Sequence, residues 1–82
     1  MLNQEALWQR VAAIKRQVIE ATGSKLSHEF RSTQVYQIYT GLCGECQMAY
    51  EDQELDENYV ARLEHYAHRV IDLYQKGMVE NG

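Results

Sequence analysis

Hydrophobic residues recur with the period of an α-helix along most of this chain, and the clearest case lies between Val35 and Tyr50. The apolar positions of this segment are Val35, Ile38, Tyr39, Leu42, Cys46 and Ala49. Their spacing places them on one helix face, and three flanking residues widen that face to an arc of roughly 160°; these are Tyr36, Cys43 and Tyr50. One neighbouring helix cannot cover so wide an arc. We therefore expect this helix to pack between two partners.

A second helix is predicted over residues 3–22. Its apolar seam repeats at alternating steps of four and three residues and consists of Leu7, Val11, Ile14, Val18 and Ala21. Asn3 is a favourable N-cap residue, and Leu2 and Leu7 have the spacing of a hydrophobic staple around it. Gly23 follows the last turn and can adopt the positive φ angle that ends many helices.

A third helix is predicted over residues 56–76. Leu55 and Val60 repeat the staple spacing. The residues expected to face inward are Tyr59, Val60, Leu63, Tyr66, Ala67, Val70, Leu73 and Tyr74, and those expected to face solvent are Glu64, His68, Asp72 and Lys76. Gly77 is the expected end of this helix, which leaves residues 78–82 as a frayed tail.

Residues 23–31 form the expected connector between the first two helices. Leu26 and Phe30 fall off the apolar face of the helix that follows. We therefore expect a capping loop or short turn that covers one end of the core. Ser27 and Ser32 are both suitable N-cap residues, and the apolar period favours Ser32 as the start of the middle helix.

Two glycines, Gly41 and Gly44, lie inside the predicted middle helix. Each costs roughly 1 kcal/mol relative to alanine in a helix interior. Such a glycine either lets another backbone approach or marks a break, and a break would turn residues 41–46 into a loop. The apolar period runs without interruption from Val35 to Tyr50, which favours a continuous helix.

The composition agrees with an all-α protein. The chain has 82 residues, no proline and 45% hydrophobic residues, which fits one small domain. Two short connectors make successive helices antiparallel, so the sequence predicts a three-helix up-down-up bundle with helices at about residues 3–22, 32–52 and 56–76. The alternative is a helical hairpin that completes its core by dimerisation.

The net charge of −4 is concentrated in the middle of the sequence, because residues 32–58 contain six acidic residues and no lysine or arginine. The chain shows no basic stripe, which argues against direct nucleic-acid binding. No apolar run approaches the roughly 20 residues that span a bilayer, and residues 1–10 lack the pattern of a secretion signal. We therefore expect a cytoplasmic protein with reduced cysteines and no membrane contact.

Cys43 and Cys46 form a CxxC motif, and His65 and His68 offer two further zinc ligands. In an antiparallel hairpin these four residues lie at similar heights. The histidines, however, project from the solvent side of the third helix, whereas Cys46 projects into the core. We expect both cysteines to be small core residues without a cofactor. A structural module stabilised by zinc is the alternative.

Arg62 and His68 have a spacing that formally fits the catalytic pattern of HEPN-type ribonucleases. Such a pattern arises readily by chance, and the two residues project roughly 120° apart around a helix. We therefore expect that the chain is not an enzyme, and a small HEPN-like ribonuclease remains an alternative.

Six of the eight aromatic residues are tyrosines, a residue type that suits interfaces because it combines an apolar ring with a hydroxyl group. The candidate contact residues are Tyr36, Tyr39 and Tyr50 on one flank of the middle helix and the acidic Glu51, Asp52, Glu54, Asp56 and Glu57 that follow it. The tyrosines would supply contact area, and the carboxylates would steer a basic partner. We expect a protein-interaction module, meaning a regulator, chaperone or inhibitor such as a phage-type antagonist of a nucleic-acid-binding protein. Its partner is another protein or a second copy of itself.

Overall fold

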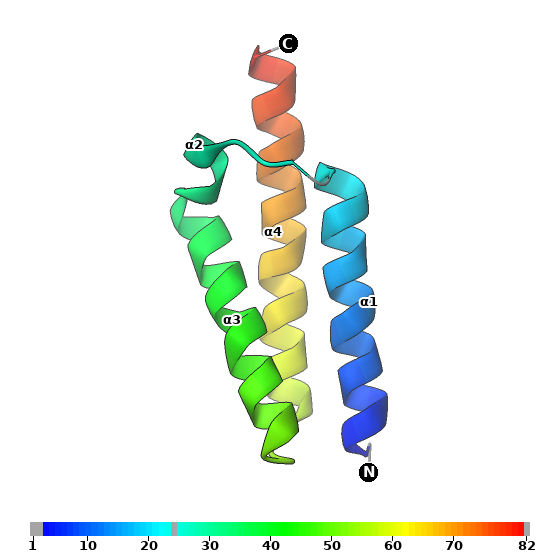
Figure 1. Cartoon of the computed structure of the whole chain (residues 1–82). Helices are drawn as coiled ribbons and strands as arrows, with labels where there is room; N and C mark the ends of the chain where they lie inside the picture. Colours follow the sequence, from blue (N-terminus) through cyan, green and yellow to red (C-terminus); the bar gives the residue numbers. More distant parts are fainter. Residues whose placement is uncertain (1–2, 24, 82) are drawn as a thin grey trace.

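The computed structural model describes residues 3–23 and 25–81, with side chains for 3–23 and 25–77. It contains α1 (Gln4–Thr22), α2 (His28–Arg31), α3 (Gln34–Glu51) and α4 (Glu57–Asn81). The three long helices run up, down and up, and the short α2 lies in the connector between α1 and α3 (Figure 1). The predicted all-α bundle is confirmed. Among the described residues, no helix has both the length and the apolar character of a membrane-spanning segment.

Helix α1 begins and ends at the predicted residues. The Asn3 side chain accepts a hydrogen bond from the backbone N–H of Ala6 at 2.7 Å. Gly23 has a φ angle of 81°, and its N–H donates to the carbonyl of Ile19 at 2.8 Å. The buried seam ends at Thr22 rather than at the predicted Ala21. Thr22 tolerates burial because its hydroxyl donates to the carbonyl of Val18 at 2.7 Å. Leu2, the other half of the predicted staple, lies outside the described residues.

The connector contains one turn of helix, and this corrects the predicted start of the middle helix. Ser27 caps α2 by accepting from the N–H of Phe30 at 3.1 Å. Ser32 is not an N-cap but the last residue of this turn, where its N–H donates to the carbonyl of His28 at 3.0 Å. The N-cap of α3 is therefore the next residue, Thr33. As expected, the connector covers one end of the core, because the half-buried Phe30 packs against the core cluster, with its ring edge-on to that of Tyr74.

Both later helices are continuous. Helix α3 runs through Gly41 and Gly44 without a break, and no described atom lies within 4 Å of where a Cβ would stand on either glycine. Gly41 and Gly44 therefore do not make room for another backbone segment. Helix α4 continues through Gly77 to Asn81, so the predicted end at Gly77 is wrong and residues 78–81 of the predicted tail belong to the helix. One glycine costs only about 1 kcal/mol in a helix, and no proline follows to stop it. Gly82 lies outside the described residues.

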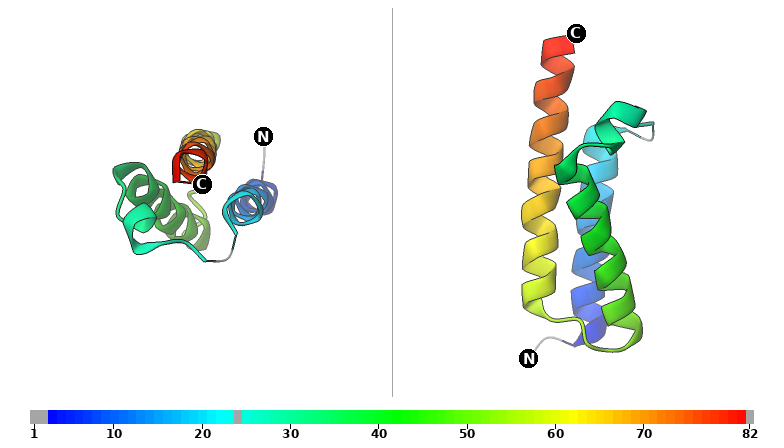
Figure 2. Two further views of the ribbon diagram at one scale, coloured as in Figure 1. Left: turned by 90° about the horizontal axis from the view of Figure 1, so that it is seen from above. Right: turned by 90° about the vertical axis from the view of Figure 1, so that its left-hand side faces the viewer.

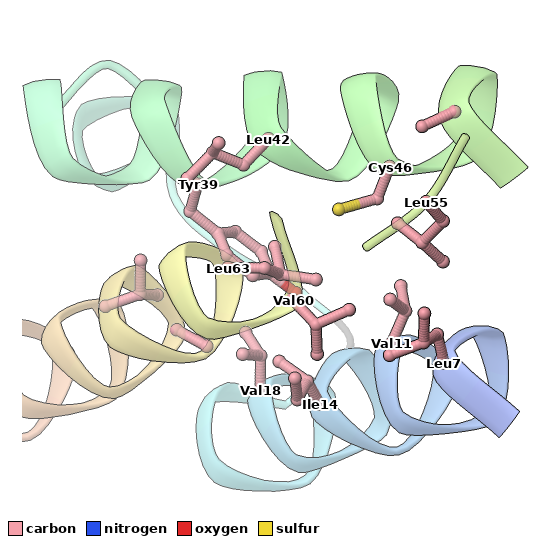
Figure 3. Close-up of a cluster of buried hydrophobic side chains, with 13 residues drawn as sticks. Leu7, Val11, Ile14, Val18, Tyr39, Leu42, Cys46, Leu55, Val60 and Leu63 are labelled. Carbon is pink, nitrogen blue, oxygen red and sulfur yellow. The ribbon is translucent and has the colours of Figure 1, made fainter. Parts of the chain in front are cut away.

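Helix α4 packs along both α1 and α3, whereas α1 and α3 contact each other much less. Figure 2 shows the three long helices end-on, arranged as a triangle. Helix α4 is therefore the one that packs closely against two partners, while α3 contacts two partners as the apolar arc suggested but meets α1 over a smaller area. The core that α4 shares with its neighbours is drawn in Figure 3 and includes Leu7, Val11, Ile14, Val18, Tyr39, Leu42, Cys46, Leu55, Val60 and Leu63. One part of the α3 arc faces α4, and the other part faces a groove towards α1.

Candidate functional site

The N-terminus of α1, the C-terminus of α3 and the α3–α4 loop meet at one end of the bundle (Figure 1). Gln4 fixes this junction with two hydrogen bonds to the backbone of Leu55. Its Nε2 donates to the carbonyl at 2.6 Å, and its Oε1 accepts from the N–H at 3.0 Å. Leu55 is almost fully buried at 1% exposure. The loop that carries the predicted acidic residues therefore has a defined position relative to α1.

This end of the molecule is acidic. Residues 3–9 and 45–61 contain seven acidic residues and no lysine, arginine or histidine. All seven are exposed, and we call them the acidic end: Glu5, Glu45, Glu51, Asp52, Glu54, Asp56 and Glu57. Among the described side chains the one ion pair joins Lys76 to Asp72 at 3.1 Å, far along α4 from this end. The carboxylates of the acidic end are therefore not neutralised by the described basic side chains.

The five acidic residues predicted as contacts differ in what they do for the fold. Asp56 caps α4, because its carboxylate accepts from the N–H of Tyr59 at 3.1 Å. Glu57 lies in the first turn of α4, where the helix dipole favours a negative charge. Of the three others, Glu51 and Asp52 lie at the C-terminus of α3, where the dipole disfavours a negative charge, and Glu54 lies in the loop between α3 and α4. We call these three the acidic trio.

An aromatic pair lies beside the acidic end. The rings of Trp8 and Tyr50 stack with centroids 4.8 Å apart and an angle of 27° between their planes. The Tyr50 hydroxyl donates to the Glu5 carboxylate at 2.8 Å, and this hydrogen bond raises the pKa of Tyr50. The ammonium group of Lys15 lies 5.0 Å from the centroid of the Trp8 ring. Both rings are half-buried and therefore present an aromatic surface of fixed orientation.

The three predicted contact tyrosines do not form one surface. Tyr39 is in the core at 6% exposure, and burial, together with the neighbouring Cys43, raises the pKa of its hydroxyl. Tyr36 is half-buried near the start of α3, and its ring lies against those of Phe30 and Tyr39. Tyr50 belongs to the opposite end of the same helix. The role of all three in partner binding stays a prediction, and geometry groups Tyr50 with the acidic end.

Tyr36 and Tyr39 instead line a groove between α1 and α3. The groove has a volume of about 370 Å³ and is lined by Lys15, Val18, Ile19, Thr22, Gly23, Leu26, Tyr36, Tyr39 and Cys43. Ile19 is 58% exposed at its edge. Burial raises the pKa of the Cys43 thiol, so this group is neutral at pH 7. We call this feature the α1–α3 groove.

The residues of the zinc alternative lie in different environments. Cys46 has no exposed surface, and its Sγ lies 4.0 Å from the carbonyl oxygen of Tyr59. Burial, as the largest cause, raises the pKa of this thiol to about 11, whereas a zinc ligand must be a thiolate. His65 and His68 are exposed on α4. Within residues 3–23 and 25–77, no three His, Cys, Asp or Glu side chains lie close enough to hold a metal ion.

The pair behind the ribonuclease alternative is also exposed on α4. Arg62 lines a shallow hollow together with Asp56, Asn58 and Tyr59. The described residues that line this hollow do not include His68. The expectation that these residues are not catalytic stays a prediction, and the HEPN-like ribonuclease stays its alternative.

The sequence predicts five residues of the acidic end and Tyr50 as candidates, but not Trp8, Glu5 or Glu45. Trp8 lies at the edge of the α1 seam, and its partner is 42 positions away in the sequence. A helical wheel of α1 alone shows only an aromatic residue that widens the seam. The pairing becomes visible once α1 and α3 are aligned antiparallel, because residues near the start of one then lie level with those near the end of the other.

Comparisons with protein-family models, with curated proteins and with solved structures found no match to this chain. Two surface features of the molecule bear on its function, the acidic end with its aromatic pair and the α1–α3 groove.

Proposed function

We propose that this chain is a non-enzymatic interaction module that binds a basic protein surface with its acidic end. The position of the acidic trio is the observation that supports this most strongly. Glu51 and Asp52 lie where the dipole of α3 opposes their charge, and the described basic side chains do not pair with any residue of the trio. Charges that lower the stability of the folded chain are expected where they bind an external partner.

The aromatic pair supplies the second half of such an interface. Tryptophan and tyrosine are the residues that most often dominate binding energy. Stacking and the hydrogen bond to Glu5 already hold the Trp8 and Tyr50 rings in place, so little conformational entropy is lost on binding. A partner arginine can stack on an aromatic ring and pair with a carboxylate at the same time. On Trp8 it would take the place of the Lys15 ammonium, which lies 5.0 Å from the ring centroid.

The expected partner is a protein with a cluster of arginine or lysine residues, such as a groove that otherwise holds a nucleic-acid backbone. Carboxylates placed in that groove compete with phosphates for the same basic side chains. The module would then act as a regulator or inhibitor of nucleic-acid binding. Its association would be fast at low salt and slow at high salt, because exposed charges steer the encounter.

The test is affinity capture from the host cell extract with the tagged full chain and two charge variants. The first variant removes the acidic trio through Glu51→Gln, Asp52→Asn and Glu54→Gln. The matched control removes the same number of charges elsewhere through Glu20→Gln, Glu29→Gln and Glu64→Gln, all at exposed positions. Asp56 and Glu57 are left intact because they stabilise the start of α4.

We expect a basic protein to be retained by the wild-type chain and by the control variant and to be lost by the acidic-trio variant. Equal loss from both variants would mean that net charge, and not the acidic end, determines binding. Retention by the acidic-trio variant, or capture of a protein without a basic surface, would overturn the proposal.

A further inference from the structure

The α1–α3 groove contains no residue of the acidic end and reaches the aromatic pair only at Lys15, so the proposed function leaves it unused. We propose that it binds a small carboxylic acid with a short apolar chain. Lys15 would hold the carboxylate, and the apolar residues along the groove would cover the chain. Shape, lining and charge each support this.

The groove has the size and lining of a ligand site. Its volume of about 370 Å³ falls within the range of about 300–1,000 Å³ that is common for small-molecule pockets. Its walls include Val18 and Tyr39, which belong to the buried core, and the exposed Ile19 at the edge. Thr22 adds little polarity, because its hydroxyl donates to the carbonyl of Val18.

One end of the groove carries a positive charge. Of the described residues that line it, Lys15 alone is charged, and none is acidic. Its ammonium group lies at the Trp8 ring and also close enough to Cys43 to favour the thiolate there, against the larger effect of burial. The chain has a net charge of −4. In this groove, however, the carboxylate of a ligand can pair with the Lys15 ammonium without competition from a carboxylate of the lining residues.

The other end of the groove is formed by the connector. Gly23, the C-cap of α1, and Leu26 line it there. From Lys15 to Gly23 the helix rises by about 12 Å. This length suits an extended chain such as that of octanoate, with its carboxylate at Lys15 and its methyl end near Leu26.

Cys43 provides a direct reporter of occupancy. It is half-buried in the groove, whereas Cys46, the other cysteine, has no exposed surface. Alkylation of the folded full chain by N-ethylmaleimide, a neutral reagent, therefore reports on Cys43, and a Cys43→Ser variant should not react under the same conditions. We expect octanoate, below its micelle concentration, to slow this alkylation in a saturable way.

Two variants separate the role of the charge from that of the apolar walls. Lys15→Met keeps the length of the side chain and removes the ammonium group, and it should weaken octanoate binding by about tenfold or more. Binding of octanol, which lacks the charge, should change little. Lys25→Met is the matched control, because Lys25 is exposed and is not among the described lining residues. Circular dichroism verifies that each variant is folded.

Absence of saturable protection by octanoate in the wild-type chain would overturn the proposal. Octanoate binding that is equal in Lys15→Met and the wild type would also overturn it, as would equal losses in Lys15→Met and Lys25→Met. None of these results bears on the acidic end, so failure here is distinguishable from failure of the proposed function.

Discussion

Gln4 and Leu55, 51 residues apart in the sequence, exchange two hydrogen bonds. The Gln4 side-chain amide donates to the carbonyl of Leu55 and accepts from its N–H. It therefore satisfies both backbone groups of Leu55, as a paired backbone segment would. This contact joins the first turn of α1 to the α3–α4 loop. It therefore sets the positions of the acidic trio and of the aromatic pair relative to each other.

Gln4→Ala is expected to lower the free energy of unfolding by about 2 kcal/mol. The substitution leaves two backbone groups of a nearly fully buried residue without their partners, which costs more than the loss of an exposed hydrogen bond. Urea denaturation followed by circular dichroism measures the change. Gln17→Ala is the control, since Gln17 is exposed on α1 and should change stability by less than about 0.5 kcal/mol. An equal effect of both substitutions would show that the Leu55 contact is unimportant.

Neutralising the acidic trio is expected to stabilise the isolated protein while it abolishes partner binding. Removing negative charges that lie against the C-terminal end of α3 should raise the free energy of unfolding by about 1 kcal/mol in total. Asp56→Ala should act in the opposite direction, with a loss of about 1 kcal/mol, because Asp56 caps α4. Thermal denaturation of both variants at low salt checks the signs. A destabilised trio variant would contradict our account of why these charges are present.

Gly41→Ala and Gly44→Ala are each expected to raise the free energy of unfolding by about 1 kcal/mol. Both glycines lie in the interior of α3, and a Cβ at either position meets open space among the described atoms. Chemical denaturation of the single and double variants tests this. Gly23→Ala is the contrasting control and should destabilise, because Gly23 has a positive φ angle. Destabilisation by either α3 substitution would mean that this face of the helix is covered.

Stability is expected to fall as the pH rises from about 9 to 11. Burial raises the pKa of Cys46 from 9.0 to about 11 and also raises that of Tyr39. Above pH 9 the unfolded chain releases the Cys46 proton while the folded chain keeps it, so the unfolded state binds fewer protons and gains stability. The contribution of Cys46 to this loss is on the order of 2 kcal/mol.

Cys46→Ala should reduce this pH dependence, although the smaller side chain lowers stability at every pH. Melting temperatures of both proteins across the pH range provide the comparison. The same decline in the variant as in the wild type would show that Cys46 does not cause it.

Most of the fold follows from the periodicity of the sequence. An uninterrupted apolar period leaves only one side of each helix that can face the core. The structure accordingly buries the predicted residues Leu42, Cys46, Leu63 and Val70. Helix ends were less predictable. Ser27 and Ser32 are equally good caps by residue type, and backbone hydrogen bonding decides that one begins α2 while the other ends it.

The division of the α3 surface was not predictable from the sequence. A helical wheel shows that the apolar arc is wide, but it cannot show whether a neighbouring helix or solvent faces each part of it. Helix α4 covers the part with Cys46, while Tyr36 is left to line the groove. For this reason the tyrosines were predicted as one surface and lie in two places. The five acidic residues from Glu51 to Glu57 could be identified from the sequence because they lie close together in it, whereas Glu5 joins this end only through the packing of α1 against α3.

The most direct test of the acidic end as the binding surface is an NMR titration of the labelled chain with the captured basic partner. We expect the indole N–H of Trp8, the one tryptophan in the chain, and the backbone amides of residues 47–59 to shift or broaden. Amides near Ile19 and Leu26 should keep their positions. Perturbation of those two positions, with Trp8 and residues 47–59 unchanged, would contradict the account and place the partner on the α1–α3 groove.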